Sequence, residues 1–84
     1  MKRESDEVSG LESLLGETVL LMCGNYFYAG KLSGVNTDCA VLTEASIVYE
    51  TGKWANADYA NSERLPGSEW FVRIEFIESY GKGK

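Results

Sequence analysis

The residues of this sequence that could do chemistry are few and scattered. It has no histidine, and its two cysteines, Cys23 and Cys39, stand apart from each other. Histidine is the commonest general base and metal ligand, so a cysteine nucleophile would lack the partner that activates it. No cluster of carboxylates and no glycine-rich phosphate loop takes its place. The sequence therefore predicts a protein that is not an enzyme and needs no metal or other cofactor.

Three further positions could bind a ligand, and each has a structural alternative. The aromatic run Tyr26–Tyr28 could stack on nucleic-acid bases, or it could fill the core of a small domain. Asn36 could hydrogen-bond a base edge, or it could satisfy the backbone of its own turn. Arg73 could contact a phosphate, or it could pair with Glu75 two residues on. The residues alone leave these alternatives open.

The charge balance disfavours one class of ligand. Thirteen acidic and eight basic residues give a formal net charge of −5. A protein that mainly binds phosphate groups usually has a net positive charge. No stretch reaches the roughly 18 apolar residues of a membrane helix, and the charged N-terminus lacks the apolar run of a signal peptide. We therefore expect a cytoplasmic protein with no membrane association.

Length and periodicity predict one domain that opens with a helix. A chain of 84 residues suits a single domain, which buries only about 60–65% of the surface that its unfolded form exposes. Met1–Val8 is charged and aperiodic and predicts a disordered tail. Within Ser9–Gly16 apolar residues recur at i, i+3 and i+4 from Leu11, and Ser9 with Glu12 makes a capping box. The three leucines of this short amphipathic helix are expected to pack on the rest of the domain.

Five strands are predicted after the helix. The first is almost continuously apolar, as in a strand covered on both faces, and Gly24-Asn25 follows it as a two-residue turn suited to positive φ. Gly30 lies inside the second strand and indicates a bend or a bulge. The fourth strand changes phase near Phe76-Ile77 and is expected to turn there into a short fifth. The stretches that carry these strands are Glu17–Cys23, Tyr26–Ser33, Cys39–Glu50 and Trp70–Tyr80.

One long connection, residues 51–69, separates the third and fourth strands. It holds the single proline of the chain and scattered small polar residues. A connection this long in a small domain is either a functional loop or a partly structured excursion. Trp54 and Tyr59 within it could form a lid over a ligand, a contact between subunits or a local core. Residues 82–84 are expected to be a C-terminal tail.

The predicted elements fit a strongly bent five-stranded antiparallel barrel, with the helix over one open end. In this arrangement Cys23 and Cys39 fall at opposite ends of the strand between them, about 25 Å apart at roughly 3.3 Å per residue. A disulfide needs Cα atoms within about 7 Å of each other. Both cysteines are therefore expected to be free thiols that pack as small apolar residues.

Two groups of residues resemble the sequence motifs of a known family. The first group is Gly16-Glu-Thr-Val, then Gly24-Asn-Tyr-Phe-Tyr-Ala-Gly30-Lys-Leu32, then Gly34-Val-Asn36 and Val41-Leu42-Thr-Glu-Ala45; the second is Val72-Arg73 with Ile77 following. They resemble the two motifs of the Sm/LSm superfamily, which includes bacterial Hfq. The resemblance covers roughly Leu11 to Tyr80. It implies a single Sm-like domain over residues 9–81, with a short N-terminal helix and a bent barrel of the SH3 type.

The resemblance also implies where RNA would be contacted, namely at Asn36, Asp38, Cys39 and Arg73. The family usually has an aspartate where this chain has Asn36, and an asparagine close to the position of Cys39. Arg73 stands at the family's arginine, but Ile74 replaces the glycine that follows it. One of four signature positions is kept, so the resemblance implies a degenerate uridine pocket.

A ring is the assembly that the same resemblance implies. The stretch Trp70–Phe76 is rich in aromatic and β-branched residues, and such an edge strand left bare would invite association. Sm proteins pair their fourth strand with the fifth strand of the next subunit, a heterologous contact that closes into a ring. The subunit interface would then be formed by Trp70, Phe71, Val72, Ile74, Phe76 and Ile77.

Two functions stand as alternatives on this fold. The first is a non-enzymatic Sm-like protein that forms a homo-oligomeric ring and serves as a scaffold, which could bind single-stranded RNA. The second is a protein-interaction or assembly adaptor that binds other proteins and no RNA. The partners expected are therefore further copies of the chain, RNA or other proteins.

Overall fold

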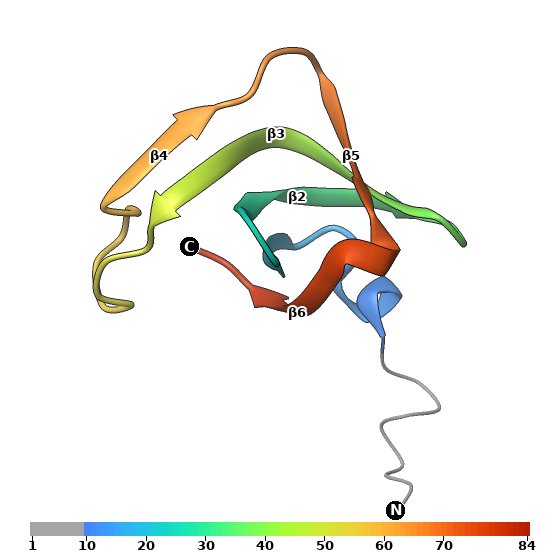
Figure 1. Ribbon diagram of the computed structural model, residues 1–84, viewed down its shortest axis with the longest axis horizontal. Helices are drawn as coiled ribbons and strands as arrows, with labels where there is room; N and C mark the ends of the chain where they lie inside the picture. The colour runs from blue at the N-terminus through green and yellow to red at the C-terminus, as the bar shows by residue number, and fades with distance from the viewer. Residues whose placement is uncertain (1–9) are drawn as a thin grey trace, which may run out of the picture.

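The computed structural model describes residues 10–84, in which six antiparallel strands form one strongly bent sheet (Figure 1). Met1–Val8, predicted as a tail, and Ser9 of the predicted capping box lie outside these residues. The prediction of a mainly β fold is confirmed. The strands are β1 (Thr18–Cys23), β2 (Phe27–Val35), β3 (Cys39–Glu50), β4 (Asn61–Arg64), β5 (Glu69–Arg73) and β6 (Ile77–Lys82), and two 3-10 turns are η1 (Leu11–Leu14) and η2 (Ile74–Phe76).

Strand β1 lies between β2 and β6 and is covered on both faces, as its continuous apolar run predicted. Val19, Leu20 and Leu21 are each at most 2% exposed. Because side chains alternate along a strand, Val19 and Leu21 enter the main core while Leu20 enters a second cluster on the other face. Tyr59, from the β3–β4 loop, packs against that second cluster. Of the roles considered for Tyr59, the local core is the one observed.

Gly30 marks a bulge between β2 and β3, as predicted. The register of the two strands shifts between Ala29 and Lys31, so that Gly30 faces both Glu44 and Ala45 of β3. A bulge bends a strand and increases its twist. The long strand β3, whose ends match the predicted Cys39–Glu50, bends at this point and carries different partners on its two halves.

The bulge leads to a first prediction, at Glu44. Glu44 is the one non-glycine residue among those described that has a positive φ, at 52°. Side chains disfavour this region and glycine does not, so Glu44→Gly should raise the free energy of unfolding by about 0.5–1 kcal/mol. Urea unfolding at one fixed protein concentration measures the change. Glu50→Gly, in the same strand at an ordinary φ, should lower it; equal losses in both variants would contradict the prediction.

Strands β4 and β5 lie one after the other along the same strand, β3. β4 pairs with the half of β3 that ends at Glu50, and β5 pairs with the half that begins at Cys39. The predicted loop 51–69 therefore contains a strand, and the predicted number of five strands is wrong. Asn61–Arg64 is short, polar and exposed along its whole length, so it lacks the apolar alternation by which a strand is recognised in a sequence.

The sheet is bent but not closed, and the predicted closure into a barrel is wrong. β5 pairs with β3 and β6 pairs with β1, whereas β5 and β6 do not pair with each other. The predicted turn before Ile77 is confirmed, but it is a 3-10 turn, η2, rather than a hairpin. The N–H of Ile74 donates to the carbonyl oxygen of Asp38 at 2.8 Å. This bond continues the pairing of β3 with β5 by one residue and places η2 beside the start of β3.

The predicted two-turn helix is also wrong, because η1 is a single 3-10 turn. Leu11 is buried and Leu14 packs against the main core, but Leu15 is 48% exposed. Leu15 already has an extended ψ of 132°, and Gly16 follows with a φ of 88°. A helix this short has too few hydrogen bonds to persist as an α-helix. η1 contacts β2 and β6 at one end of the core.

The connection between β1 and β2 differs in detail from the predicted two-residue turn. It spans three residues, Gly24–Tyr26, and neither Gly24 nor Asn25 has a positive φ. The N–H of Cys23 donates to the carbonyl oxygen of Tyr26 at 3.0 Å. The longer turn places Tyr26 at the mouth of the groove described below.

Candidate binding surface

Three strands have a free outer edge within residues 10–84: the short polar strand β4, which pairs with β3 alone, and the strands β5 and β6. β5 is hydrogen-bonded to β3 alone, and β6 to β1 alone (Figure 1). Along an antiparallel strand the backbone groups of alternate residues point to opposite edges, so each of these strands presents unpaired N–H and C=O groups on its outer edge. β5 and β6 are joined by η2, and their edges therefore belong to one region of the molecule.

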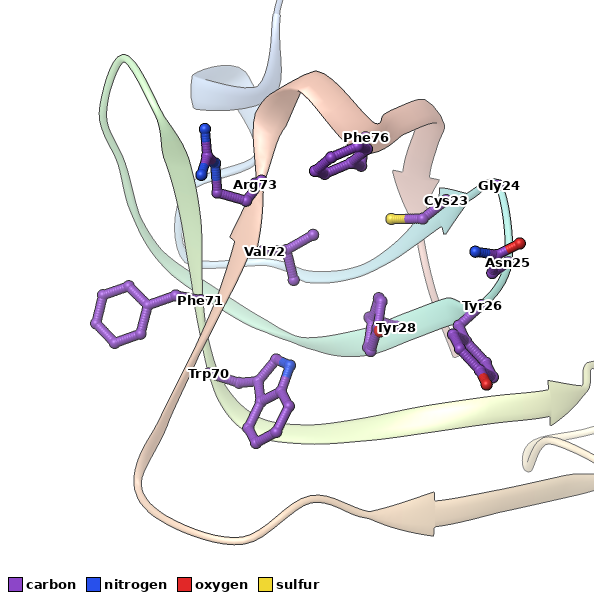
Figure 2. Close-up of a pocket in the computed structure, with 10 residues that line it drawn as sticks. All are labelled: Cys23, Gly24, Asn25, Tyr26, Tyr28, Trp70, Phe71, Val72, Arg73 and Phe76. Atoms are coloured by element: carbon purple, nitrogen blue, oxygen red, sulfur yellow. The ribbon is translucent and has the colours of Figure 1, made fainter.

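A groove of about 400 Å³ lies beside these edges, between β5 and the β1–β2 turn (Figure 2). Trp70 and Val72 enter it from β5, Tyr28 from β2 and Phe76 from η2, while the side chain of Phe71 leaves β5 on the opposite side. Phe76 is 60% exposed although it is a large apolar side chain. The residues that line the groove are Cys23, Gly24, Asn25, Tyr26, Tyr28, Trp70, Phe71, Val72, Arg73 and Phe76.

The groove is electrically neutral at pH 7 apart from Arg73. Burial, followed by the negative charge of Glu78, raises the pKa of the Cys23 thiol above its ordinary value of 9.0. Burial also raises the pKa of the Tyr28 phenol, and neighbouring Cys23 and Tyr26 add to the shift. Both groups therefore stay protonated, and Cys23 acts as a small apolar side chain. Aromatic rings and neutral polar tips suit an apolar ligand better than an anion.

These shifts predict a pH dependence of stability. A group whose pKa is higher in the folded than in the unfolded chain contributes stability that is complete below the unfolded pKa and is lost as the pH rises through the folded pKa. We expect the free energy of unfolding to fall as the pH rises above 9.0, the ordinary value for Cys23. Cys23→Ala should make this fall shallower. Urea unfolding between pH 7 and about pH 10.5 measures it, and identical slopes in the wild type and Cys23→Ala would contradict it.

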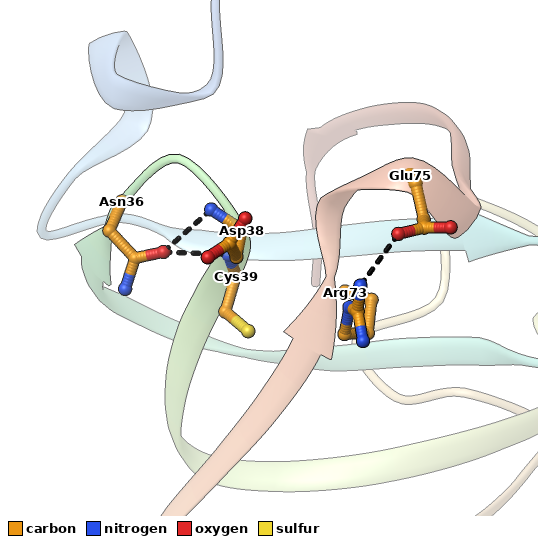
Figure 3. A network of polar contacts seen from close by, with 5 residues as sticks. All are labelled: Asn36, Asp38, Cys39, Arg73 and Glu75. Atoms are coloured by element: carbon orange, nitrogen blue, oxygen red, sulfur yellow. Dashed lines mark hydrogen bonds and ion pairs between the residues drawn. The ribbon is translucent and has the colours of Figure 1, made fainter.

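The four residues predicted to contact RNA are brought together by the pairing of β3 with β5. Cys39 lies opposite Arg73 in the register. The side-chain Oδ1 of Asn36 accepts hydrogen bonds from the N–H groups of Asp38 and Cys39, both at 2.8 Å (Figure 3). Asn36 thus satisfies the backbone of its own turn, which was the structural alternative for this residue. Both cysteines are free thiols, Cys23 buried and Cys39 half-buried.

The charge of this cluster does not favour phosphate. Nη2 of Arg73 lies 2.7 Å from Oε1 of Glu75, in an ion pair whose side chains are 59% and 60% exposed (Figure 3). The alternative considered for Arg73, pairing with Glu75, is the one observed. Asp38 adds a second carboxylate close by, so two negative charges stand against one positive charge. An incoming phosphate would have to displace Glu75 and approach Asp38.

The predicted interface residues differ in how far they reach the surface. Phe71 and Phe76 are exposed, at 59% and 60%. Trp70, Ile74 and Ile77 are half-buried, and Val72 belongs to the core of its own subunit at 5% exposed. Of the groove residues near the β1–β2 turn, Gly24 and Asn25 were predicted only as a turn, and Tyr26 and Tyr28 as either a stacking platform or part of the core. The alternation of Tyr26 and Tyr28 could have indicated that these two share a face, because it sets both apart from Phe27, which packs on the second cluster.

Comparison with protein families and curated proteins identified no relative of this chain. No protein-family model matches the sequence, and no curated protein matches it. Within residues 10–84, no three His, Cys, Asp or Glu side chains gather where they could hold a metal ion. None of the helical turns there has the length and apolar character needed to cross a membrane.

Proposed function

We propose that the chain is a non-enzymatic, Sm-like scaffold whose copies join edge to edge in a homo-oligomeric ring. The observation that carries the proposal is the pair of free edges, β5 and β6, next to the exposed side chains of Phe71 and Phe76. A free edge of this kind is a template for pairing with another chain. Pairing β5 of one copy with β6 of the next would use both edges at once.

The charges of the two edges favour one alignment. β5 carries Glu69 and Arg73, and β6 carries Glu78 and Lys82, each pair four residues apart. In an antiparallel alignment with Glu69 opposite Lys82 of the next copy, Arg73 falls opposite Glu78. A parallel alignment sets like charges against each other. Opposite charges across neighbouring strands are favourable and like charges are not, so the charges support antiparallel pairing.

The same alignment sets Phe71 opposite Tyr80 of the next copy. These side chains are 59% and 45% exposed in the single chain. An aromatic pair across two strands contributes about 0.2–1 kcal/mol, and the apolar area removed from water adds to it. The contact joins two different edges, so it is heterologous and gives a ring when the rotation between copies closes. A ring would also supply the burial that a domain of this size lacks.

The RNA function implied by the Sm resemblance is expected to be weak in this chain. The cluster holds the carboxylates of Asp38 and Glu75 against the one guanidinium of Arg73. The side-chain carbonyl oxygen of Asn36 already accepts two hydrogen bonds within its own turn. A ring would multiply these charges around its axis. We therefore propose a degenerate uridine pocket.

Native mass measurement with and without oligouridine tests both parts of the proposal. We expect a homo-oligomer at micromolar concentration and weak or no binding of oligouridine, with any binding falling steeply as salt is added. Arg73→Ala distinguishes a pocket from general attraction. A stable monomer at micromolar concentration would overturn the ring. Tight oligouridine binding that Arg73→Ala abolishes would overturn the degenerate pocket.

An assembly adaptor that binds protein and no RNA is the second candidate on this fold. The neutral aromatic groove favours it, because such a surface suits apolar side chains of a protein partner. The net charge of −5 also favours a partner that is not itself an anion. Oligouridine binding at any salt concentration would rule out the adaptor, which requires none, whereas an absence of binding agrees with both candidates.

A further inference from the structure

The side chain of Lys84 ends in a cage formed by the β3–β4 loop. Its Nζ donates hydrogen bonds to the backbone carbonyl oxygens of Thr51, Lys53 and Asp58, at 2.7, 2.8 and 3.1 Å. A lysine ammonium group has three N–H donors and no acceptor. Each of the three donors therefore has an oxygen partner, and all three oxygens come from one short loop.

Two aromatic rings complete the cage. Nζ of Lys84 lies 5.1 Å from the centre of the Tyr59 ring and 5.4 Å from the centre of the Trp54 ring. A cation within about 6 Å of a ring face is attracted by the quadrupole of the ring. The rings thus attract the positive charge of the ammonium group, and the carbonyl oxygens accept hydrogen bonds from its N–H groups.

The loop that makes the cage is held in place by bonds of its own. Gly52 reverses the chain with a φ of 71°. The N–H of Asn56 donates to the Lys53 carbonyl at 3.0 Å, beside the bond from Lys84. Tyr59 packs on the second core cluster. The cage is therefore attached to the body of the sheet, as a preorganised site requires.

The chain at residues 82–84, predicted to be a tail, lies along the sheet and brings Lys84 to the cage. The N–H of Gly83 donates to the carbonyl oxygen of Thr18 at 2.9 Å, and the N–H of Lys84 donates to the hydroxyl of Tyr59 at 3.0 Å. A Cβ atom at position 83 would lie 2.7 Å from that hydroxyl and 3.1 Å from the backbone of β1. Glycine is thus the residue that permits this approach.

We propose that residues 51–60 form a binding site for a primary ammonium group, and that Lys84 of the same chain is its resident ligand. The site goes beyond the scaffold function and does not depend on the ring. Its three carbonyls select against a quaternary ammonium, which has no N–H to donate, and its rings select against an acylated lysine, which has no charge. The site therefore distinguishes an unmodified lysine side chain from its trimethylated and acylated forms.

Removal and replacement of the ligand test the site. In Lys84→Ala the indole N–H resonance of Trp54 should shift, and n-butylammonium should return it towards its wild-type position. n-Butyltrimethylammonium should bind at least about tenfold more weakly, because it makes none of the three hydrogen bonds. Lys31→Ala is the matched control: Lys31 is an exposed lysine on β2 that contributes nothing to the cage, and its loss should leave the Trp54 resonance in place. The wild type should not respond to n-butylammonium, because its cage is occupied.

A second measurement needs no variant. Acetylation of wild-type protein by a water-soluble active ester should modify Lys84 more slowly than the exposed Lys31, as read by mass spectrometry of the digested chain. Equal rates at Lys84 and Lys31 would overturn the proposal. So would a Trp54 resonance that n-butylammonium leaves unmoved in folded Lys84→Ala, and so would equal affinity for the primary and the quaternary ammonium.

Discussion

Arg73→Glu should convert the proposed ring into monomers, and adding Glu78→Arg to the same chain should restore it. In the alignment proposed for β5 and β6, Arg73 of one copy lies opposite Glu78 of the next, so the single variant creates a like-charge pair at every interface. The double variant exchanges the two charges and recovers an opposite pair. Because the subunits are identical, one substitution alters every contact of the ring at once.

The expected loss of the oligomer is large because the same substitution acts at every interface of the ring. A cross-strand charge pair changes stability by roughly 0.2–1 kcal/mol, and reversing one charge replaces an attraction by a repulsion. The same change occurs at each interface, so the loss accumulates around the ring. Native mass at low micromolar concentration should show mostly monomer for Arg73→Glu and for Glu78→Arg, and the oligomer for the double variant. High salt should narrow these differences, since both edges are exposed.

Two controls separate this contact from other effects of Arg73. The residue pairs with Glu75 in its own subunit, and Glu75→Gln removes that pair without changing the proposed interface, so it should keep the oligomer. Arg64→Glu reverses an exposed charge on β4, which takes no part in the proposed contact between β5 and β6, and should also keep it. If the double variant stays monomeric while both controls assemble, the Arg73–Glu78 register is wrong even though a ring exists.

The strongly apolar strands were predictable from the sequence because local pattern decides them. The run of β1 is apolar at consecutive positions, which requires cover on both faces, and the structure supplies it at Val19, Leu20 and Leu21. The whole extent of β3 and the bulge at Gly30 also followed from residue type and alternation. These features depend on neighbours in the chain, which a sequence displays directly.

The features that depend on distant partners were not predictable in this way. β4 is polar throughout and exists because β3 offers it a hydrogen-bonding edge. The predicted helix is a single 3-10 turn, because Leu15 already has an extended ψ and the few residues before it cannot sustain an α-helix. The sheet stays open because β5 pairs with β3 and β6 pairs with β1, so the two strands do not meet. Each outcome depends on contacts between residues well separated in the sequence or on the geometry of one backbone position.

The candidate surfaces also differ in how far the sequence predicts them. The loop at Asn36 and the strand at Arg73 were expected to meet, and the β3–β5 register places Cys39 opposite Arg73. The groove forms where β5, η2 and the β1–β2 turn come together, and the alternation of Tyr26 and Tyr28 alone does not indicate that these three segments meet. The cage around Lys84 is built from backbone carbonyls, which carry no sequence signal at all.

Gly30→Ala should lower the free energy of unfolding by about 1–3 kcal/mol, the range for overpacking a tightly filled site. A Cβ atom at this position would lie 3.0 Å from the carbonyl oxygen of Thr43, 3.1 Å from Cα of Ala45 and 3.3 Å from Cβ of Leu42. Two of these atoms belong to the backbone of β3, which cannot withdraw without breaking the bulge. The φ of Gly30 is not positive, so the cost is steric crowding rather than backbone strain.

Gly34→Ala is the matched control for this prediction. Gly34 lies in the same strand, and a Cβ atom there would meet the side chain of Val41 at 3.7 Å, an ordinary contact distance. We expect a change smaller than about 0.5 kcal/mol, as for most substitutions away from the core. Urea unfolding of both variants at one protein concentration gives the comparison. Equal stabilities of Gly30→Ala and Gly34→Ala would mean that β3 can move away from β2 at the bulge. The bend of the sheet, which sets the positions of β4 and β5 on β3, would then not depend on the absence of a side chain at residue 30.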